Sequence, residues 1–405
     1  MQFSDDSTRF IKYLLPKFKH FYDNDDKFNS IKHISSLYPD LIAGDKYYNK
    51  IANKIHVKFT EKADIIEPDS INSSHYSKTI NEYIKQNKSS QITYSFNILA
   101  RKIVVHFTLF DEDVSSIPKY DKYIRLIIMW LFMCNKYTSA DCSKTLNIFF
   151  FLTPIAKKLP EHKNSVIGYD NVNTGMTFRC IPNNEIFIYR YEEWFKVFIH
   201  ETFHSYGLDI DSQDNSVLKP IIKNIFPIDS SFEIAEAYTE IWARLLNCCF
   251  VSYETMKIKS QEDFNLYLQF TLHIEKMFSL FQMKKILAHM DLTYENLWSS
   301  TQISEYMRKN MYREESNVFC YFVLAGILMN DFDKFIQWCK INNNNFIKFN
   351  KTSNNTTNFG RFIESIYKDN GLLDNIKLAP DINKKNRDFE LLHKSGRMTC
   401  VEIKI

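Results

Sequence analysis

The chain has 405 residues, which corresponds to two or three domains or to one domain with large attachments. Its 51 Lys and Arg against 48 Asp and Glu give a formal charge of +3, and 45% of the residues are hydrophobic. These values are typical of soluble globular proteins and argue against a polybasic nucleic-acid-binding protein. The 34 Phe and 23 Tyr against only 8 Gly indicate a genome rich in A/T codons, so a single Tyr carries little weight as a catalytic candidate.

No segment of the sequence predicts export or membrane insertion. Residues 1–6 are acidic and polar and lack both the basic and the apolar region of a signal peptide. The most apolar run, 318–329, is shorter than the roughly 20 residues that span a bilayer. The eight cysteines include no C-x-x-C pair and no disulfide framework. We therefore expect an intracellular protein in a reducing compartment.

The first 90 residues are expected to be mostly helical, because apolar residues recur at helical spacing in 8–22, 40–55 and 76–87. From residue 91 the pattern changes to alternating β-type segments. The elements predicted there are, in chain order, a hairpin of 92–98 and 102–110, a helix at 119–137, a buried strand at 146–153, and a strand pair at 174–180 and 185–190.

A sharply bounded helix is predicted from 192 to 206, since Gly207 is a typical residue to follow a helix. Beyond it, the sequence predicts a polar loop at 209–216, helices at 231–250, 261–287 and 315–340, an Asn-rich linker or exposed loop at 342–358, and a strand of unknown partner at 397–405. We divide the chain accordingly into a mostly helical N-terminal region, an upper lobe with the sharply bounded helix, a helical lower lobe, and an Asn-rich linker with a C-terminal segment, at 1–90, 91–207, 208–340 and 341–405.

The sharply bounded helix contains His200-Glu201-Thr202-Phe203-His204, an H-E-x-x-H motif. Because an α-helix turns once in 3.6 residues, both imidazoles face one side and can bind a single Zn²⁺, with Glu201 beside the metal-bound water. The alternative to a zinc site is a helix with a purely structural role that carries two histidines by coincidence. The motif therefore predicts a zinc site with Glu201 as general base, and a catalytic zinc needs a third protein ligand.

A following helix supplies candidates for that third ligand. The metzincin pattern requires His at position 210, where this chain has Ile210. Glu236 and Glu240 lie four residues apart on one helical face, so one can bind the metal while the other accepts the second N–H of a ligand histidine. Glu233 is the rival ligand, but no carboxylate follows it four residues on. The alternative is that Glu236 and Glu240 belong to a solvated acidic face of a helix without a metal site, although the residues that flank them are apolar.

The pairing of this H-E-x-x-H with Glu236-x-x-x-Glu240 resembles the gluzincins, and the sequence of 236–243 looks most like the second zinc helix of lethal-factor-type toxin peptidases. The resemblance covers 173–244 and implies an α+β fold. Its zincin-like metallopeptidase core would have a mixed sheet, an active-site helix and a helical lower lobe, with helical N- and C-terminal extensions. Separately, 171–175 and 192–209 are similar to an uncharacterised zincin-like family of giant DNA viruses, which implies the host cytoplasm or the virion as location.

Carried over residue by residue, the gluzincin resemblance makes His200, His204 and Glu236 the zinc ligands, Glu201 the general base, and Glu240 the residue that holds a ligand histidine.

One feature of the resembled enzymes is missing. They carry a Tyr shortly before the third ligand that can stabilise the oxyanion, whereas this chain has only Tyr206 between His204 and Glu236. Tyr206, Tyr238 and Tyr253 are the candidates, with packing as the expected role of each. Cys180 could approach the zinc as a cysteine switch, but a small buried hydrophobe is the expected state.

The sequence thus predicts a zinc-dependent metallopeptidase that acts on a peptide or protein substrate, with no nucleic-acid partner and no membrane span. The edge strand near 174–180 is expected to bind the substrate by strand addition. The alternative is a catalytically silent zincin-fold protein with a structural or virion interaction role. The sequence makes no prediction about substrate specificity or oligomeric state.

Overall fold

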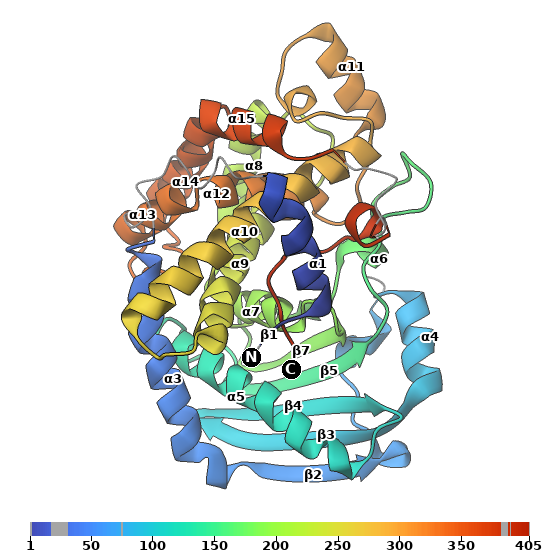
Figure 1. Ribbon diagram of the computed structural model, residues 1–405, viewed down its shortest axis with the longest axis vertical. Coiled ribbons are helices and arrows are strands. Elements are labelled where there is room, and N and C mark those ends of the chain that lie inside the picture. The colour runs from blue at the N-terminus through green and yellow to red at the C-terminus, as the bar shows by residue number, and fades with distance from the viewer. Residues whose placement is uncertain (1, 18–30, 74–75, 382–387, 389, 405) are drawn as a thin grey trace.

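The computed structural model describes residues 2–17, 31–73, 76–381, 388 and 390–404. Strands lie together in the lower part of Figure 1, and most of the helices lie above them. The described residues form an α+β fold with a mixed sheet of six strands, in agreement with the α+β class expected from the sequence.

The sheet has the strand order β2-β3-β4-β5-β7-β6. The predicted antiparallel hairpin is formed by β3 and β4. The strands β4, β5 and β7 run parallel to one another, and β6 pairs antiparallel with β7 at the edge. β6 is shorter than the strand predicted at 174–180. The strand bounds are β2 (His56–Glu61), β3 (Lys88–Ile98), β4 (Arg101–Phe110), β5 (Thr145–Thr153), β6 (Gly175–Thr177) and β7 (Asn183–Arg190).

Both faces of the sheet are covered. Successive side chains of a strand point to opposite faces, and the central strands carry apolar residues on each. Phe150 of β5 packs with Trp194 and Phe198 of the helix above it, whereas Phe149 and Phe151 belong to a separate cluster on the other face. That second cluster includes two buried isoleucines of α4 (Lys78–Asn87). Burial on both faces explains why β5 is apolar throughout rather than alternating.

Helix α7 (Trp194–Ser205) is the element predicted from 192 to 206. It packs between β7 and α9 (Ile234–Thr255), and all of its residues are buried. Gly207 ends it with a φ of +62°, and its N–H donates to the carbonyl of His204. A side chain at Gly207 would also lie 3.2 Å from Cys180 Cβ, so this position requires glycine.

The helices after α7 match the prediction in part. α9 and α10 (Gln261–His289) are confirmed. The polar loop predicted at 209–216 is wrong beyond Asp211, whose side chain accepts from the N–H of Asp214 and begins α8 (Ser212–Ile225). The polar composition and an internal proline concealed that helix.

The helix predicted at 315–340 is confirmed in part. The segment is helical from Phe319 on, but the π-helix η8 (Phe319–Leu324) runs into α12 (Ala325–Asn330), and Asp331 separates α12 from α13 (Phe332–Asn342).

Other α-helices of the described residues are α1 (Asp5–Leu14), α3 (Tyr38–Ile51), α5 (Ile117–Cys134), α6 (Tyr169–Val172), α11 (Gln302–Met311), α14 (Ser353–Ile366) and α15 (Asn370–Leu378).

The Asn-rich segment at 342–358 is not an exposed linker. Asn343 and Asn355 are buried, and their amide groups donate to the Tyr238 hydroxyl and to the Asn350 carbonyl, each at 2.9 Å. Thr352 caps α14 by accepting from the N–H of Asn355. Asparagine therefore satisfies buried polar groups here, which composition alone does not reveal.

The first and the last described residues lie side by side. β1 (Gln2–Phe3) pairs antiparallel with β8 (Ile403–Lys404), so β1 is the partner that the sequence left unidentified. Among the described residues of the predicted 397–405 strand, only Ile403 and Lys404 are paired in a sheet, and Ile405 lies outside the described residues. In the N-terminal region, β2 lies within the 90 residues expected to be mostly helical and forms one edge of the main sheet. The main hydrophobic core takes residues from all four regions into which the sequence was divided.

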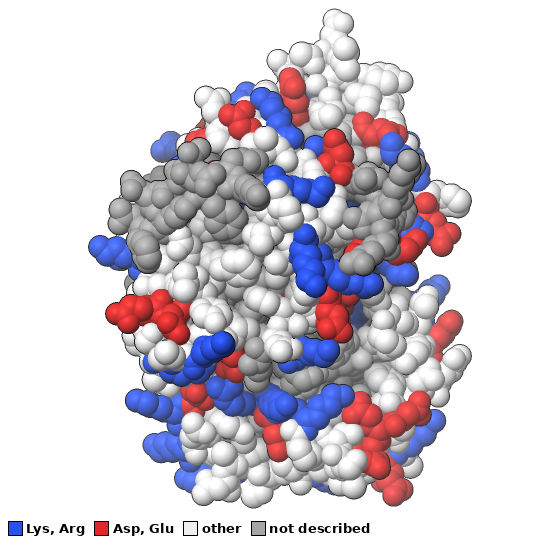
Figure 2. Space-filling model, viewed as in Figure 1, with Lys and Arg blue, Asp and Glu red and all other residues white. Residues whose placement is uncertain are grey.

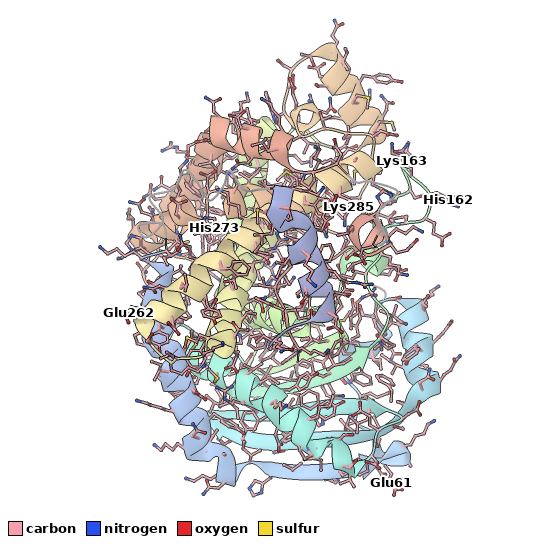
Figure 3. All side chains as sticks on the ribbon, viewed as in Figure 1. Glu61, His162, Lys163, Glu262, His273 and Lys285 are labelled. Carbon is pink, nitrogen blue, oxygen red and sulfur yellow. A yellow bond between two sulfur atoms is a disulfide. The ribbon has the colours of Figure 1, made fainter. Side chains whose placement is uncertain are left out.

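The segment before β8 is buried and held by ionisable side chains. Glu275 of α10 accepts from the Thr399 hydroxyl and from the N–H groups of Cys400 and Val401. Lys285, which Figure 3 places on α10 beside the C-terminal segment, donates to the carbonyls of Leu392 and Ser395. Burial raises the pKa of Glu275 to about 7 and lowers that of Lys285 to about 7.

We expect Glu275 to make the stability of the protein fall as the pH rises. Its carboxyl titrates near pH 7 in the folded protein and at about 4.3 in the unfolded chain, so between these values the folded state binds more protons. Glu275→Gln should remove this dependence. The difference in the free energy of unfolding, variant minus wild type, should therefore increase by about 3 kcal/mol from pH 4 to pH 8. Urea unfolding across that range measures it. Glu262→Gln on the exposed part of α10 is the control, and an unchanged difference for Glu275→Gln would contradict the account.

On the face shown in Figure 2, Lys and Arg are interspersed with Asp and Glu, with no extended area of one sign over the described residues. Within the described part of the chain, no helix combines the length and the apolar character that a bilayer crossing requires.

Candidate metal centre

The H-E-x-x-H residues lie at the centre of the molecule on α7. His200 and His204 are each 6% exposed and Glu201 is 7% exposed, although all three line a cavity of about 250 Å³. The helix is fixed beneath them by its packing on β7 and α9. The three side chains therefore border a cavity that is open on one side while they remain largely shielded from solvent.

Glu236, in the first turn of α9, completes a cluster with the two histidines. His200 Nε2 lies 3.1 Å from Glu236 Oε2 and 3.3 Å from His204 Nε2, and His204 Nε2 lies 3.5 Å from Glu236 Oε2. One ligand atom from each residue lies within 4.8 Å of the others, close enough to surround one metal ion. The structure thus brings together the three residues expected to bind metal.

Glu233, the rival third ligand, is not part of this cluster. Its side chain is 46% exposed and faces the Arg179 guanidinium at 3.6 Å. It precedes the first turn of α9, where its backbone rather than its side chain starts the helix. The geometry therefore favours Glu236 over Glu233.

Each histidine is held through its other ring nitrogen. His200 Nδ1 lies 3.1 Å from Glu240 Oε2, which agrees with the expected contact between Glu240 and a ligand histidine. His204 Nδ1 lies 2.7 Å from Asp209 Oδ2, a contact that the sequence analysis missed. A carboxylate that accepts from Nδ1–H fixes the tautomer of the imidazole in which the lone pair of Nε2 is free. This is the form that binds metal. Both Nε2 atoms lie within 3.5 Å of Glu236 Oε2.

Glu240 is itself enclosed by cations. It is fully buried, and its two oxygens accept from Lys196 Nζ at 3.0 Å each, while Arg244 Nε donates to Oε1 at 2.9 Å. Burial opposes ionisation, but Lys196 and Arg244 lower the pKa of Glu240 well below its usual range. Glu240 is therefore a permanent carboxylate that His200 can use as acceptor.

The charges of the cluster favour a cation between the ligands. Burial alone would lower the pKa of His204, but Glu236 and Asp209 raise it to about 10. Burial would raise the pKa of Glu236, but the two histidines lower it. Without metal, protons supply the positive charge that the buried carboxylates require, and a divalent cation can replace them.

We expect Asp209→Asn to weaken metal binding about 10–100-fold, because it removes the acceptor that fixes His204 while leaving the ligand atoms in place. Competition with a zinc-sensitive fluorescent chelator measures this affinity. Asp229→Asn, at an exposed position, is the control and should leave the affinity unchanged. Equal affinities for all three proteins would show that Asp209 does not orient the ligand.

Glu201 faces the cavity directly beneath the edge strand. A Cβ atom at Gly175 of β6 would lie 3.1 Å from Glu201 Cγ and Oε1 and 3.0 Å from a methyl group of Val197. Glycine thus allows the strand to pass close to this carboxylate. Burial raises the pKa of Glu201, while the two histidines oppose that shift. The carboxyl is placed to exchange protons with whatever occupies the cavity.

None of the three tyrosines considered from the sequence lines the cavity. The hydroxyl of Tyr238 donates to the Ile347 carbonyl and that of Tyr253 to Asp45, and Tyr206 is buried against Arg101. All three pack elsewhere, as expected.

Tyr321 of η8 is the tyrosine that does line the cavity. Its hydroxyl donates to Glu236 Oε2 at 3.1 Å, and its backbone carbonyl accepts from Arg244 at 2.7 Å. It lies inside the apolar run 318–329, within the helix predicted from the sequence at 315–340. No local signal separates it from the other tyrosines, because only the packing of η8 against α9 brings it to the site.

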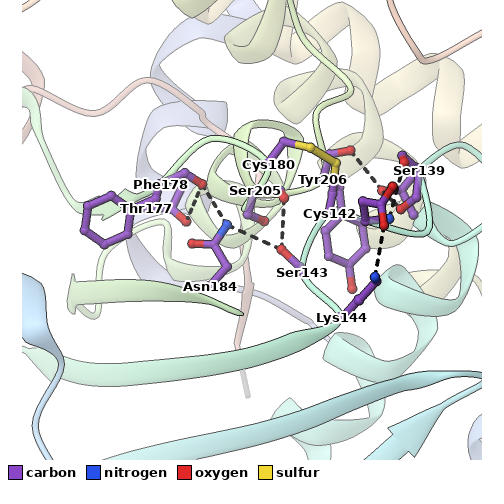
Figure 4. The surroundings of a disulfide bond; sticks show 12 residues. Ser139, Cys142, Ser143, Lys144, Thr177, Phe178, Cys180, Asn184, Ser205 and Tyr206 are labelled. Carbon is purple, nitrogen blue, oxygen red and sulfur yellow. Dashed lines mark hydrogen bonds and ion pairs between the residues drawn. A yellow bond between two sulfur atoms is a disulfide. The ribbon is translucent and has the colours of Figure 1, made fainter. Parts of the chain in front are cut away.

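Cys180 is neither a buried hydrophobe nor a metal-directed thiol, because it forms a disulfide with Cys142. The prediction of reduced cysteines is therefore wrong for this pair, whose 38-residue separation gave no framework signal. Figure 4 shows the bond beside the end of α7, where the N–H of Cys180 donates to the His204 carbonyl and the Ser143 hydroxyl to the Ser205 carbonyl. The other six cysteines are free and buried.

The disulfide holds the segment that carries Arg179 over the cavity. The guanidinium donates to the Ile210 carbonyl at 3.0 Å and lies 3.6 Å from Glu236 Oε1 and 3.7 Å from Asp209 Oδ2. Arg179 is 35% exposed at its side chain and lines the cavity. It adds a fixed positive charge at the histidine-rich end of the site, which the sequence analysis did not anticipate.

No protein-family model, curated protein or solved structure matches this chain. The chemistry of the site therefore has to be derived from its own residues.

Proposed function

We propose that the chain is a zinc-dependent metallopeptidase of the gluzincin type, with His200, His204 and Glu236 as metal ligands and Glu201 as general base. The observation that carries this proposal is the convergence of the three ligand atoms within 4.8 Å in a cavity that Glu201 also faces. Three protein ligands leave a position open for water and substrate, which distinguishes a catalytic from a structural zinc site.

The donor set supports zinc over the common alternatives. Two imidazole nitrogens and one carboxylate oxygen are a typical catalytic zinc set, whereas Ca²⁺ and Mg²⁺ prefer oxygen donors throughout. The carboxylates on His200 Nδ1 and His204 Nδ1 complete the second layer of contacts that such sites use. Zn²⁺ in this position would polarise the scissile carbonyl and make a nucleophilic water available near neutral pH.

Glu201 supplies the proton transfers. Its carboxylate takes a proton from the attacking water and delivers it to the leaving amine, which is the role of a general base that then acts as acid. Burial raises the pKa of its carboxyl, which makes the carboxylate a stronger base than that of an exposed glutamate. A purely structural role for the cavity would not require an ionisable group at this point.

Tyr321 is the proposed oxyanion donor. Its hydroxyl already contacts the ligand carboxylate of Glu236, so it lies beside the position where a substrate carbonyl oxygen would develop negative charge. We expect Tyr321→Phe to lower kcat about 10²-fold without changing the bound metal, since one hydrogen bond to the developing charge is lost. Steady-state kinetics with metal analysis measures both. Tyr238→Phe is the matched control, and an equal loss in both variants would contradict this role.

β6 is the proposed docking edge for substrate. Among the described residues it is paired with a strand on one side only, and its three residues line the cavity together with Glu201. A peptide in extended conformation can add to this edge through backbone hydrogen bonds and so present successive peptide bonds to the metal.

The test is hydrolysis of a proteome-derived peptide library by the zinc-loaded protein. We expect cleavage that a chelator abolishes and added Zn²⁺ restores. Zinc binding in stoichiometric amount without any cleavage would contradict the peptidase and favour the silent structural role. Absence of zinc binding would contradict the metal site itself.

A further inference from the structure

A wall formed by Asn173 and the loop 314–317 closes one end of the cavity beside the edge strand β6. The Ser316 hydroxyl donates to Asn173 Oδ1 at 2.9 Å, and both residues line the cavity. Asn173 lies two residues before β6, whereas Ser316 belongs to the loop before η8. This contact joins the β6 side of the cavity to the η8 side. An extended peptide that lies along β6 therefore cannot continue past Asn173.

Hydrogen bonds to the backbone fix the start of this loop. Ile167 and Glu314 form a β-bridge, and the N–H of Glu315 donates to the Ile167 carbonyl at 3.0 Å. The Glu314 carboxylate accepts from the Tyr312 hydroxyl at 3.0 Å and from the N–H of Phe319 at 2.7 Å. The loop is thus bound both to the segment before β6 and to the first residue of η8.

Asn317 fixes the end of the loop. Its Oδ1 accepts from the N–H of Glu233 at 2.8 Å, which ties the loop to the residue that starts α9. Its φ of +49° lies in the left-handed region, which asparagine adopts more readily than most other residues. The wall therefore rests on several hydrogen bonds at both ends of the loop rather than on one side chain.

The opposite end of the cavity, after β6, is closed by the Arg179 side chain. Its guanidinium lies 3.6 Å from Glu233 Oε2 and from Glu236 Oε1 and 3.7 Å from Asp209 Oδ2, and it donates to the Ile210 carbonyl at 3.0 Å. The side chains of Arg179 and Glu233 are 35% and 46% exposed, and an exposed ion pair contributes at most about 1 kcal/mol. Rotation of this partly exposed side chain opens this end to a peptide, whereas the wall has to be taken apart at several points.

The wall lies close to the place where the peptide bond would be cleaved. Glu201 faces Gly175, because a Cβ atom there would lie 3.1 Å from Glu201 Oε1, and Asn173 is two residues before Gly175. At about 3.3 Å per residue of extended chain, the wall is about 7 Å further along β6. Room for about two residues of a bound peptide therefore remains between the bond beside Glu201 and the wall.

We propose that the wall restricts the protein to chain ends. The substrate is a short peptide or the terminus of a longer chain, and no more than about two of its residues lie between the cleaved bond and one of its ends. Hydrolysis adds one water across that peptide bond and releases a fragment of one or two residues. The inference rests on the proposed function for the cleavage, whereas the closed end itself requires only the described contacts.

The binding experiment uses the zinc-loaded Glu201→Gln protein, so that no turnover interferes. The probe is one library of peptide sequences displayed on a small carrier protein in three formats, at its N-terminus, at its C-terminus, and in a loop between flexible Gly/Ser linkers. We expect one of the two terminal formats to be retained at least about 10-fold more than the loop format, because a loop has to pass the wall. The format that is retained identifies the terminus that enters the cavity and hence the direction of the peptide along β6.

The cleavage experiment maps each cut in free peptides by mass spectrometry. With the wild-type protein we expect every cut to lie within about two residues of the same end. The test variant combines Asn173→Ala with Ser316→Ala, which removes the side-chain contact of the wall and leaves the backbone bridge at Ile167 in place. It should admit one further residue, so that three-residue fragments increase at least about 10-fold. Asn310→Ala with Ser216→Ala, two exposed positions outside the cavity, is the matched control and should leave the fragment lengths unchanged.

Equal retention of the loop and terminal formats overturns the inference, as do fragment lengths that stay unchanged in a test variant that still binds zinc. Failure of the proposed function gives a different pattern. Retention of one terminal format without any cleavage by wild type would keep the closed end and reject the peptidase. Cuts in the interior of long peptides, at rates equal to those near the ends, would do the reverse. Retention of none of the three formats, with no cleavage, would contradict both.

Discussion

Glu201→Gln is expected to retain the metal and to lose about 10²–10⁴-fold in the rate of peptide hydrolysis, the usual contribution of a positioned general base. The change keeps the shape of the side chain and removes only its ability to take a proton. Because Glu201 is not one of the three converging ligand residues, its charge is not needed to hold the ion. Metal analysis by mass spectrometry and kcat on one cleaved peptide measure the two properties separately.

Glu185→Gln is the matched control for this variant. Glu185 is buried in β7, where its carboxylate accepts from the N–H groups of Asp69 and Ser70 and does not line the cavity. The Glu185→Gln substitution should lower the stability of the protein but leave the turnover per folded molecule unchanged. Full activity in Glu201→Gln would remove the general base from the account, and loss of metal in that variant would make Glu201 a ligand instead.

Glu236→Gln is expected to lower the metal affinity by more than about 100-fold, since it replaces a ligand carboxylate, whereas changes one contact further out cost 10–100-fold. The variant also leaves His200, His204 and Arg179 facing a neutral group. Isothermal titration with Zn²⁺ measures the affinity.

Glu233→Gln separates the two candidates for the third ligand. Glu233 is three residues away and largely exposed, so its substitution should leave the affinity within about 2-fold of wild type. The reverse order, with Glu233→Gln the weaker binder, would show that the loop before α9 rearranges and that Glu233 binds the metal.

Features that depend only on the spacing of residues within one helix were the most predictable from the sequence. The spacing of His200 and His204 defines a common face whatever surrounds the helix, and Gly207 marks its end by its own conformation. The four-residue spacing of Glu236 and Glu240 predicted that one carboxylate would hold a ligand histidine, the gluzincin resemblance assigned that role to Glu240, and the structure shows that the histidine is His200. In each case a local rule decides the geometry.

Groups that reach the site from distant segments were missed because no local rule places them. Asp209 follows a tight turn, Arg179 is positioned by a disulfide, and Tyr321 lies on a π-helix about 85 residues after the ligand that it contacts. The buried asparagines after residue 342 show the same limit, since their composition is that of a loop, whereas Asn343 is held by the distant Tyr238 hydroxyl.

The most direct measurement of the central claim is a comparison of all new peptide termini generated in a cell extract by wild-type protein and by Glu201→Gln at equal zinc content. The account predicts a defined set of new termini with wild type that is absent with the variant and absent after chelation. An identical set with both proteins, or no new termini with either when zinc is bound at one ion per chain, would contradict it.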